Sequence, residues 1–154
     1  MRRRRRLLLI AAFAFAAPAP AYGERDDGPT DGRFEADYDR RPTGEDFARH
    51  YPAGPLDESR GGSAVLCCTP RADRTLDCRV GAEAPNGDGF GAAAVAISRS
   101  FRLTRRSYEG FMADPSNWMQ VPIHFRVEPG TTIDIDAFRR LTQGLCRPAA
   151  TPVS

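Results

Sequence analysis

Few residues in this chain could do chemistry, and their spacing favours structural roles. His50 and His124 are its two histidines, and neither is spaced with a nucleophile and a carboxylate in a catalytic motif. Asp134 and Asp136 fit a helix N-cap better than an acid/base pair. The sequence therefore predicts that the protein is not an enzyme, with His50 at a helix end and His124 solvated on a strand.

The four cysteines indicate disulfide bonds rather than a metal centre. A zinc site needs CxxC pairs or well-placed histidines, and Cys67, Cys68, Cys78 and Cys146 do not supply that spacing. An even number of cysteines in a small exported domain is typical of a disulfide framework. We therefore expect no metal site.

The pairing of these cysteines depends on the register of a predicted hairpin. A three-residue loop centred on Asp73 places Cys68 opposite Cys78, whereas a two-residue loop would pair Cys67 with Cys78. Cys78 follows the apolar alternation of its strand, which favours the pair Cys68–Cys78. Cys67 and Cys146 are then left for each other.

A glycine-rich segment, PNGDGFG at residues 85–91, resembles a phosphate-binding loop only weakly. It lacks the GxGxxG or Walker spacing and the lysine. An entry into a helix over residues 90–101, capped by Asp88 or a neighbour, explains it better. The expected buried stripe of that helix is Phe90, Ala94, Ile97 and Phe101, and the expected solvent-facing residues are Ser98, Arg99 and Arg102. No cofactor is predicted.

The first 23 residues, MRRRRRLLLIAAFAFAAPAPAYG, have the three parts of a secretory signal peptide. Their apolar run, residues 7–17, is shorter than the roughly 20 residues that cross a bilayer, so cleavage is favoured over a short retained anchor. Removing their five arginines takes the formal net charge from +2 to −3. That balance argues against nucleic acid as a partner.

Composition divides the rest of the chain into three parts. Residues 24–44 mix charges with Gly and Pro, which predicts a flexible polar linker. Residues 45–128 form the predicted domain, and residues 129–154 form a C-terminal extension with one short helix. For that helix we expect a cap at Asp134 or Asp136, an apolar stripe of Phe138, Leu141 and Leu145, an end at Gly144 and a tether at Cys146.

The predicted domain is α+β, with a small antiparallel sheet packed against one or two helices. Two short helical turns are expected before Gly62, followed by hairpin strands at residues 63–69 and 76–83 and a helix at 90–101. Residues 104–117 are polar, contain Gly110 and Pro115, and are expected to form a loop. The expected inward residues of the hairpin are Ala64, Leu66, Cys68, Leu76, Cys78 and Val80.

Residues 119–127 alternate as a strand. One face has Met119, Val121, Ile123, Phe125 and Val127, and the other has Gln120, Pro122, His124 and Arg126. A proline within a strand belongs at a sheet edge, because it cannot donate to a ladder of hydrogen bonds. This strand is therefore expected at the edge of the sheet.

Five segments in order resemble the TonB C-terminal domain family, in particular its short, cysteine-bearing alphaproteobacterial forms. They are Tyr51-Pro52, Gly62-x-Ala-Val-Leu-x-Cys-Thr, Leu76-Asp-Cys-Arg-Val, Gly89-Phe-Gly-x-Ala-Ala and Val121-Pro-Ile-x-Phe. The resemblance implies a three-stranded antiparallel sheet with helices on one face. It also implies that an edge strand, here residues 119–127, binds an extended segment of an outer-membrane receptor.

The expected function is thus a periplasmic protein-binding domain that pairs this strand with an outer-membrane receptor or another envelope protein. A membrane association is expected only if the N-terminus is retained, in which case the chain would be a short energy transducer. A structural envelope protein without peptide binding is the third reading. The resemblance does not identify the partner.

Overall fold

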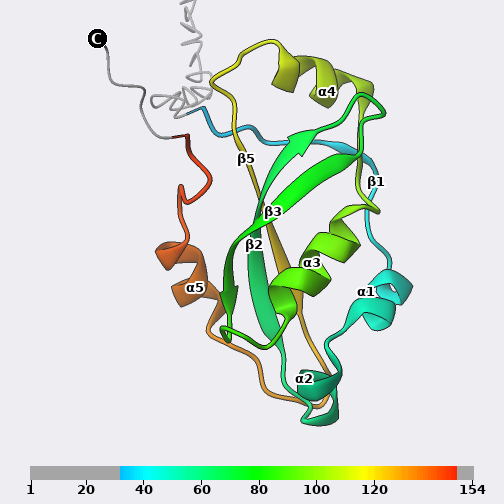
Figure 1. Ribbon diagram of the computed structural model, residues 1–154, viewed down its shortest axis with the longest axis vertical. Coiled ribbons are helices and arrows are strands. Elements are labelled where there is room, and N and C mark those ends of the chain that lie inside the picture. Colours follow the sequence, from blue (N-terminus) through cyan, green and yellow to red (C-terminus); the bar gives the residue numbers. More distant parts are fainter. Residues whose placement is uncertain (1–31, 149–154) are drawn as a thin grey trace, which may run out of the picture.

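Three antiparallel strands form the centre of the structure, a computed structural model that describes residues 32–148 (Figure 1). They are β2 (Gly62–Pro70), β3 (Leu76–Ala84) and β5 (Met119–Phe125), in the order β3-β2-β5. Helices pack against this sheet, which confirms the predicted α+β class. The predicted signal peptide, residues 1–23, and residues 24–31 and 149–154 lie outside the described residues.

The hairpin of β2 and β3 has the register centred on Asp73, with Cys68 opposite Cys78. In the connection, the Asp73 carboxylate accepts hydrogen bonds from the backbone and hydroxyl of Thr75. Arg74 adopts a φ of 70°, the left-handed conformation that glycine usually takes in tight turns. The register shifts between Val65 and Leu66.

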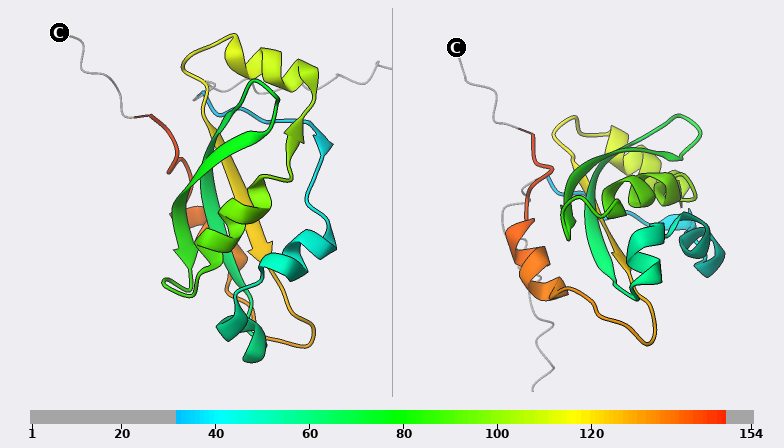
Figure 2. Two further views of the ribbon diagram at one scale, coloured as in Figure 1. Left: turned by 45° about the vertical axis from the view of Figure 1, so that its right-hand side comes forward. Right: turned by 60° about the horizontal axis from the view of Figure 1, so that its bottom comes forward.

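One face of the sheet is covered by α3 (Phe90–Ser98), with α1 (Gly44–His50) and α2 (Ala53–Asp57) beside it (Figure 2). The predicted stripe of Phe90, Ala94, Ile97 and Phe101 is buried, as are the inward residues of β5. Val80 was expected inward but is 41% exposed, because β3 is an outer strand and Val80 lies beside Gly91, which has no side chain to cover it.

The N-cap of α3 and the burial of its last residue, Ser98, differ from the prediction. Its N-cap is Gly89, at a φ of 85°, and the Asp88 carboxylate instead pairs with Arg60. Ser98, expected in solvent, is 1% exposed and donates its hydroxyl to the carbonyl of Val95 at 2.8 Å. That local hydrogen bond satisfies the hydroxyl and lets a small polar residue be buried.

The opposite face of the sheet is covered by α5 (Ile135–Leu141) of the C-terminal extension (Figures 1 and 2). Asp134 caps it by accepting from the backbone of Ala137 at 2.9 Å. The predicted stripe is wrong beyond Phe138: Leu141 is 85% exposed and Leu145 is 45% exposed. The helix is so short that only Phe138 reaches the cluster formed with Val65, Trp118 and Cys146.

Residues 32–44 do not behave as the predicted flexible linker. Strand β1 (Tyr38–Arg40) pairs with β4 (Arg102–Leu103), and the ring of Phe34 packs edge-on against Phe111. Phe34 and Tyr38 pack against the core, and the backbone N–H of Asp37 donates to the hydroxyl of Ser107 at 2.9 Å, so the segment is held on the domain.

Helix α4 (Arg105–Met112) occupies the segment predicted to be a loop. Thr104 caps it, its hydroxyl accepting from the backbone of Ser107 at 3.1 Å, and Phe111 is buried. Gly110 lies within the helix, and the ring of Phe34 packs against that position. None of the helices in the described part of the chain has the length and apolar character needed to cross a membrane.

Candidate functional site

The free edge of β5 is the candidate site. β5 pairs with β2 along its length, from Gly62 opposite Phe125 to Cys68 opposite Met119. Within the described residues, no strand pairs with its other side over this length. The strand ends at Phe125, two residues short of the predicted end, so Arg126 and Val127 continue beyond it.

The direction of the backbone groups follows from Pro122. Pairing with β2 is continuous across this proline, which is possible only where the missing N–H would point away from β2. Trp118, four positions earlier and thus equally oriented, donates its N–H to the carbonyl of Gly32 at 2.9 Å. Gln120 and His124 therefore direct their backbone N–H groups to the free edge, as does Arg126 if the alternation continues.

A groove lies beside this edge on the face that carries α1, with a volume of about 540 Å³. We call it the α1 groove; its lining is Gly44, Phe47, Ala48, Tyr51, Leu56, His124, Arg126 and Val127. The rings of Phe47 and Tyr51 both pack edge-on against Phe125, at 5.5 Å between centroids. Tyr51 also donates its hydroxyl to the carbonyl of Arg60 at 2.9 Å, so the groove has a fixed, largely apolar wall.

A second hollow lies on the face that carries α5, with a volume of about 260 Å³. We call it the α5 pocket; its lining is Arg33, Val65, Gln120, Pro122, His124, Phe138, Arg139, Arg140, Thr142 and Gln143. Three arginines and no carboxylate are among these described residues. The Oε1 atom of Gln120 is buried here without a hydrogen-bond partner in the described part of the chain.

His124 lines both hollows and is not the solvated residue expected. Its Nδ1 atom lies 2.8 Å from the hydroxyl oxygen of Ser63. Burial is the main cause that lowers the pKa of His124, and the charges of Arg126 and Arg139 lower it further. The imidazole is therefore held in its neutral form.

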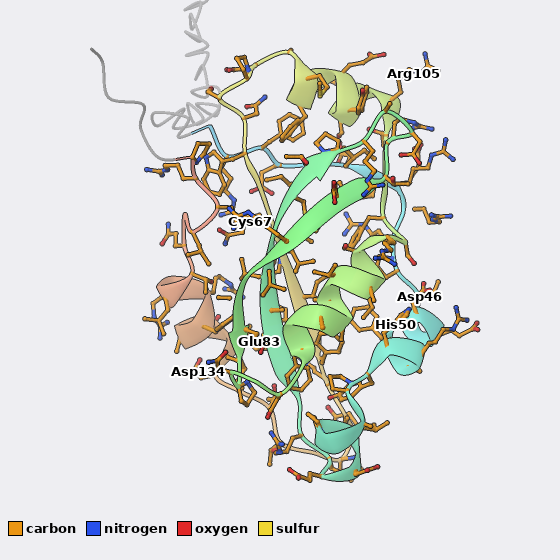
Figure 3. The ribbon with its side chains drawn as sticks, viewed as in Figure 1. Asp46, His50, Cys67, Glu83, Arg105 and Asp134 are labelled. Atoms are coloured by element: carbon orange, nitrogen blue, oxygen red, sulfur yellow. A yellow bond between two sulfur atoms is a disulfide. The ribbon has the colours of Figure 1, made fainter. Side chains whose placement is uncertain are left out.

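The Ser63–His124 pair does not have the arrangement of a hydrolase site. Ser63 is 0% exposed in the central strand, so its hydroxyl cannot reach a substrate. No carboxylate is among the described residues that line the two hollows beside His124. His50 is the last residue of α1, and it is not among the residues that line either hollow (Figure 3).

Two disulfide bonds use all four cysteines. Cys68 is bonded to Cys78 within the hairpin, and Cys67 is bonded to Cys146 across 79 positions of sequence. These are the pairs that strand alternation favoured. Because consecutive strand residues point to opposite faces, the first bond lies in the α3 layer and the second ties the C-terminal extension to the other face.

The glycine-rich segment is occupied by a side chain that sequence reasoning missed. The Glu83 carboxylate accepts from the backbone N–H of Gly87 at 2.8 Å and also from that of Gly91 (Figure 3). An internal carboxylate thus takes the backbone donors that a phosphate would need.

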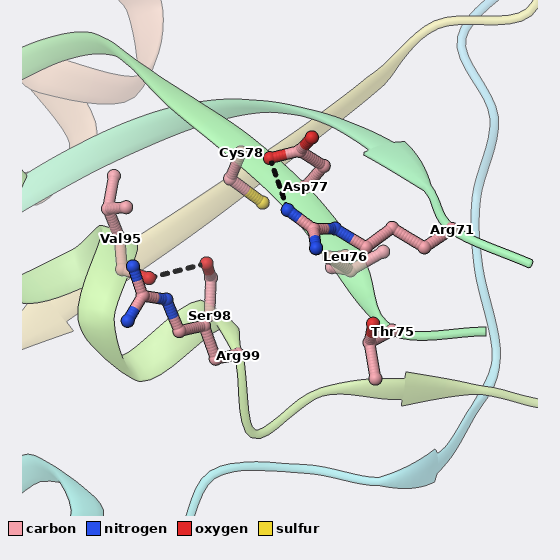
Figure 4. A pocket seen from close by; sticks show the side chains of 8 residues that line it. All are labelled: Arg71, Thr75, Leu76, Asp77, Cys78, Val95, Ser98 and Arg99. Atoms are coloured by element: carbon pink, nitrogen blue, oxygen red, sulfur yellow. Dashed lines mark hydrogen bonds and ion pairs between the residues drawn. The ribbon is translucent and has the colours of Figure 1, made fainter. Parts of the chain in front are cut away.

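A further pocket of about 360 Å³ lies beside β3 and α3 (Figure 4). It contains an ion pair of Arg71 and Asp77 at 3.2 Å, and its one cysteine, Cys78, is in a disulfide. Within residues 32–148, no group of three or more His, Cys, Asp or Glu side chains could hold a metal ion. The two hydroxyl groups of the pocket are engaged locally, Thr75 donating to the Asp73 carboxylate and Ser98 to the carbonyl of Val95.

No protein-family model, curated protein or solved structure matches the chain.

Proposed function

We propose that this chain is a TonB-type protein-binding domain that adds an extended segment of a partner protein to the free edge of β5. The supporting observation is the unpaired edge of β5 beside the α1 groove. Extended peptides bind sheet edges through main-chain hydrogen bonds and gain specificity from pockets that receive alternate side chains. The edge and the groove supply these two requirements.

The residues of the proposed site divide by the direction in which they point. Those that hold β5 to the core are Met119, Val121, Ile123 and Phe125, which are 0–6% exposed. Those that present backbone groups to the partner are Gln120, Pro122, His124 and Arg126, with Val127 in the groove wall. Pro122 offers only its carbonyl, so pairing with a partner has one gap.

The proposed partner is an outer-membrane receptor or another envelope protein, and the proposed compartment is the periplasm. Both disulfides support this compartment, because such bonds form and persist in oxidising environments. The proposal requires no cofactor.

The strand-addition step can be tested with two variants at one position. Ligands for the full chain would be selected from displayed random decapeptides, and their affinities measured by fluorescence polarisation. His124→Pro and His124→Ala both remove the imidazole and its contact with Ser63, but only His124→Pro removes the backbone donor. We expect His124→Pro to bind about 2- to 10-fold more weakly than His124→Ala, the effect of one net hydrogen bond.

Circular dichroism and thermal melting would establish that both variants fold. Equal affinity of the two folded variants for every selected peptide would contradict strand addition at β5.

A further inference from the structure

We propose that the segment accepted by β5 alternates apolar with acidic side chains, so that one face is aliphatic or aromatic and the other carries carboxylates. This inference rests on the proposed function, because it describes the ligand of the same edge. It adds a chemical identity for the side chains of the partner.

The two hollows lie on opposite faces of the sheet along one stretch of edge. Side chains of an added strand alternate between the two faces, as those of β5 do. Helices α1 and α5 lie on opposite sides of the sheet (Figures 1 and 2). His124 lines both the α1 groove and the α5 pocket, so neighbouring residues of one bound segment can reach both.

The α1 groove selects apolar side chains. Five of its eight lining residues are apolar, namely Phe47, Ala48, Tyr51, Leu56 and Val127, and Leu56 leaves 45% of its surface exposed. A bound aliphatic side chain would cover this surface. The apolar area that is buried would favour binding by roughly 25 cal/mol per Å².

The α5 pocket selects acidic side chains. Arg139 and Arg140 approach it from α5 and Arg33 from the segment before β1, with no carboxylate among the described lining residues. Arg139 is paired with Asp136 at 3.0 Å and Arg33 with Glu35 at 3.1 Å. Both carboxylates are at least 70% exposed, so these pairs are weak and can exchange with a ligand carboxylate.

The test uses three labelled decapeptides of equal length: Val alternating with Asp, Val alternating with Lys, and Ser alternating with Asp. Affinities for the full chain would be measured by fluorescence polarisation at two salt concentrations. We expect the Val/Asp peptide to bind at least about 10-fold more tightly than either other peptide. We also expect added salt to weaken its binding, because the ion pairs are screened.

Two charge-reversal variants separate the pocket from general electrostatics. Arg139→Glu with Arg140→Glu should abolish the preference for Val/Asp over Val/Lys or reverse it. The control, Arg105→Glu with Arg106→Glu, makes the same change of net charge on exposed positions of α4, outside both hollows (Figure 3). This control variant should keep the preference.

The α1 groove is tested separately with Ala48→Glu, which should weaken the binding of the peptides that contain valine.

The outcomes distinguish this inference from the proposal on which it rests. If Val/Asp and Val/Lys bind equally, and His124→Pro weakens both relative to His124→Ala, strand addition stands and acidic selection is overturned. If the control variant loses the preference as completely as the α5 variant, selection by the pocket is also overturned. If none of the three peptides binds while a selected decapeptide binds and is weakened by His124→Pro relative to His124→Ala, acidic selection is overturned and strand addition stands.

Discussion

At the scale of single residues, His124 makes stability depend on pH. Burial and the nearby arginines hold its pKa below the usual value of about 6.5, so the unfolded chain binds its proton more readily than the folded chain does. The contribution of His124 to the free energy of unfolding is therefore complete above the pKa of the unfolded state, and it declines as the pH falls through and below about 6.5.

We therefore expect the free energy of unfolding of the wild type, minus that of His124→Gln, to decrease from pH 7.5 to pH 5.5. Glutamine keeps a polar group that can reach Ser63 but does not titrate. Urea unfolding of both proteins at both pH values measures this difference. A difference that stays constant or grows toward pH 5.5 would show that the imidazole is not held neutral.

At the scale of elements, the bond between Cys67 and Cys146 holds α5 on the sheet. One large side chain of this short helix, Phe138, is buried, and its other contacts are few. We expect Cys67→Ala with Cys146→Ala to remove the hydrogen-exchange protection of α5 and to lower the free energy of unfolding by about 2–4 kcal/mol.

The matched control is Cys68→Ala with Cys78→Ala, which removes the bond that spans 10 positions within the hairpin. It should leave the protection of α5 intact, because the extension remains tied to β2. Persistence of α5 protection in Cys67→Ala with Cys146→Ala would mean that packing alone fixes the helix.

Because α5 forms one wall of the α5 pocket, Cys67→Ala with Cys146→Ala should also lose the preference for acidic peptides.

Elements with a strong local pattern could be predicted from the sequence, whereas the two hollows could not. The alternation across β5 and the position of Pro122 were sufficient to predict an edge strand. Helix α4 was missed because Gly110 suggested a loop, and tertiary contact with Phe34 outweighs that local preference.

The walls of both hollows combine segments that are far apart in the chain. Phe47 faces the end of β5, and Arg33 lies with Arg139 and Arg140. Local periodicity carries no information about such pairs, because it reports one segment at a time. The edge strand was thus predictable, but the hollows beside it were not.

At the scale of the whole molecule, the fate of residues 1–23 decides between the proposed periplasmic domain and a short anchored energy transducer. Their pattern predicts cleavage after Ala21 or Gly23. We expect mass spectrometry of the exported protein to find an N-terminus at Tyr22 or Glu24. An intact N-terminus with the chain in the membrane fraction would favour the transducer instead.

The neighbouring positions of Cys67 and Cys68 have a mechanical consequence. One peptide bond in the central strand joins two covalent cross-links that leave it on opposite faces. Tension applied to the chain beyond Cys146 would enter β2 at Cys67 through the disulfide, so the backbone between the two cysteines, α5 included, is bypassed. A load on the C-terminal end of the chain would therefore be borne by the central strand rather than by the extension.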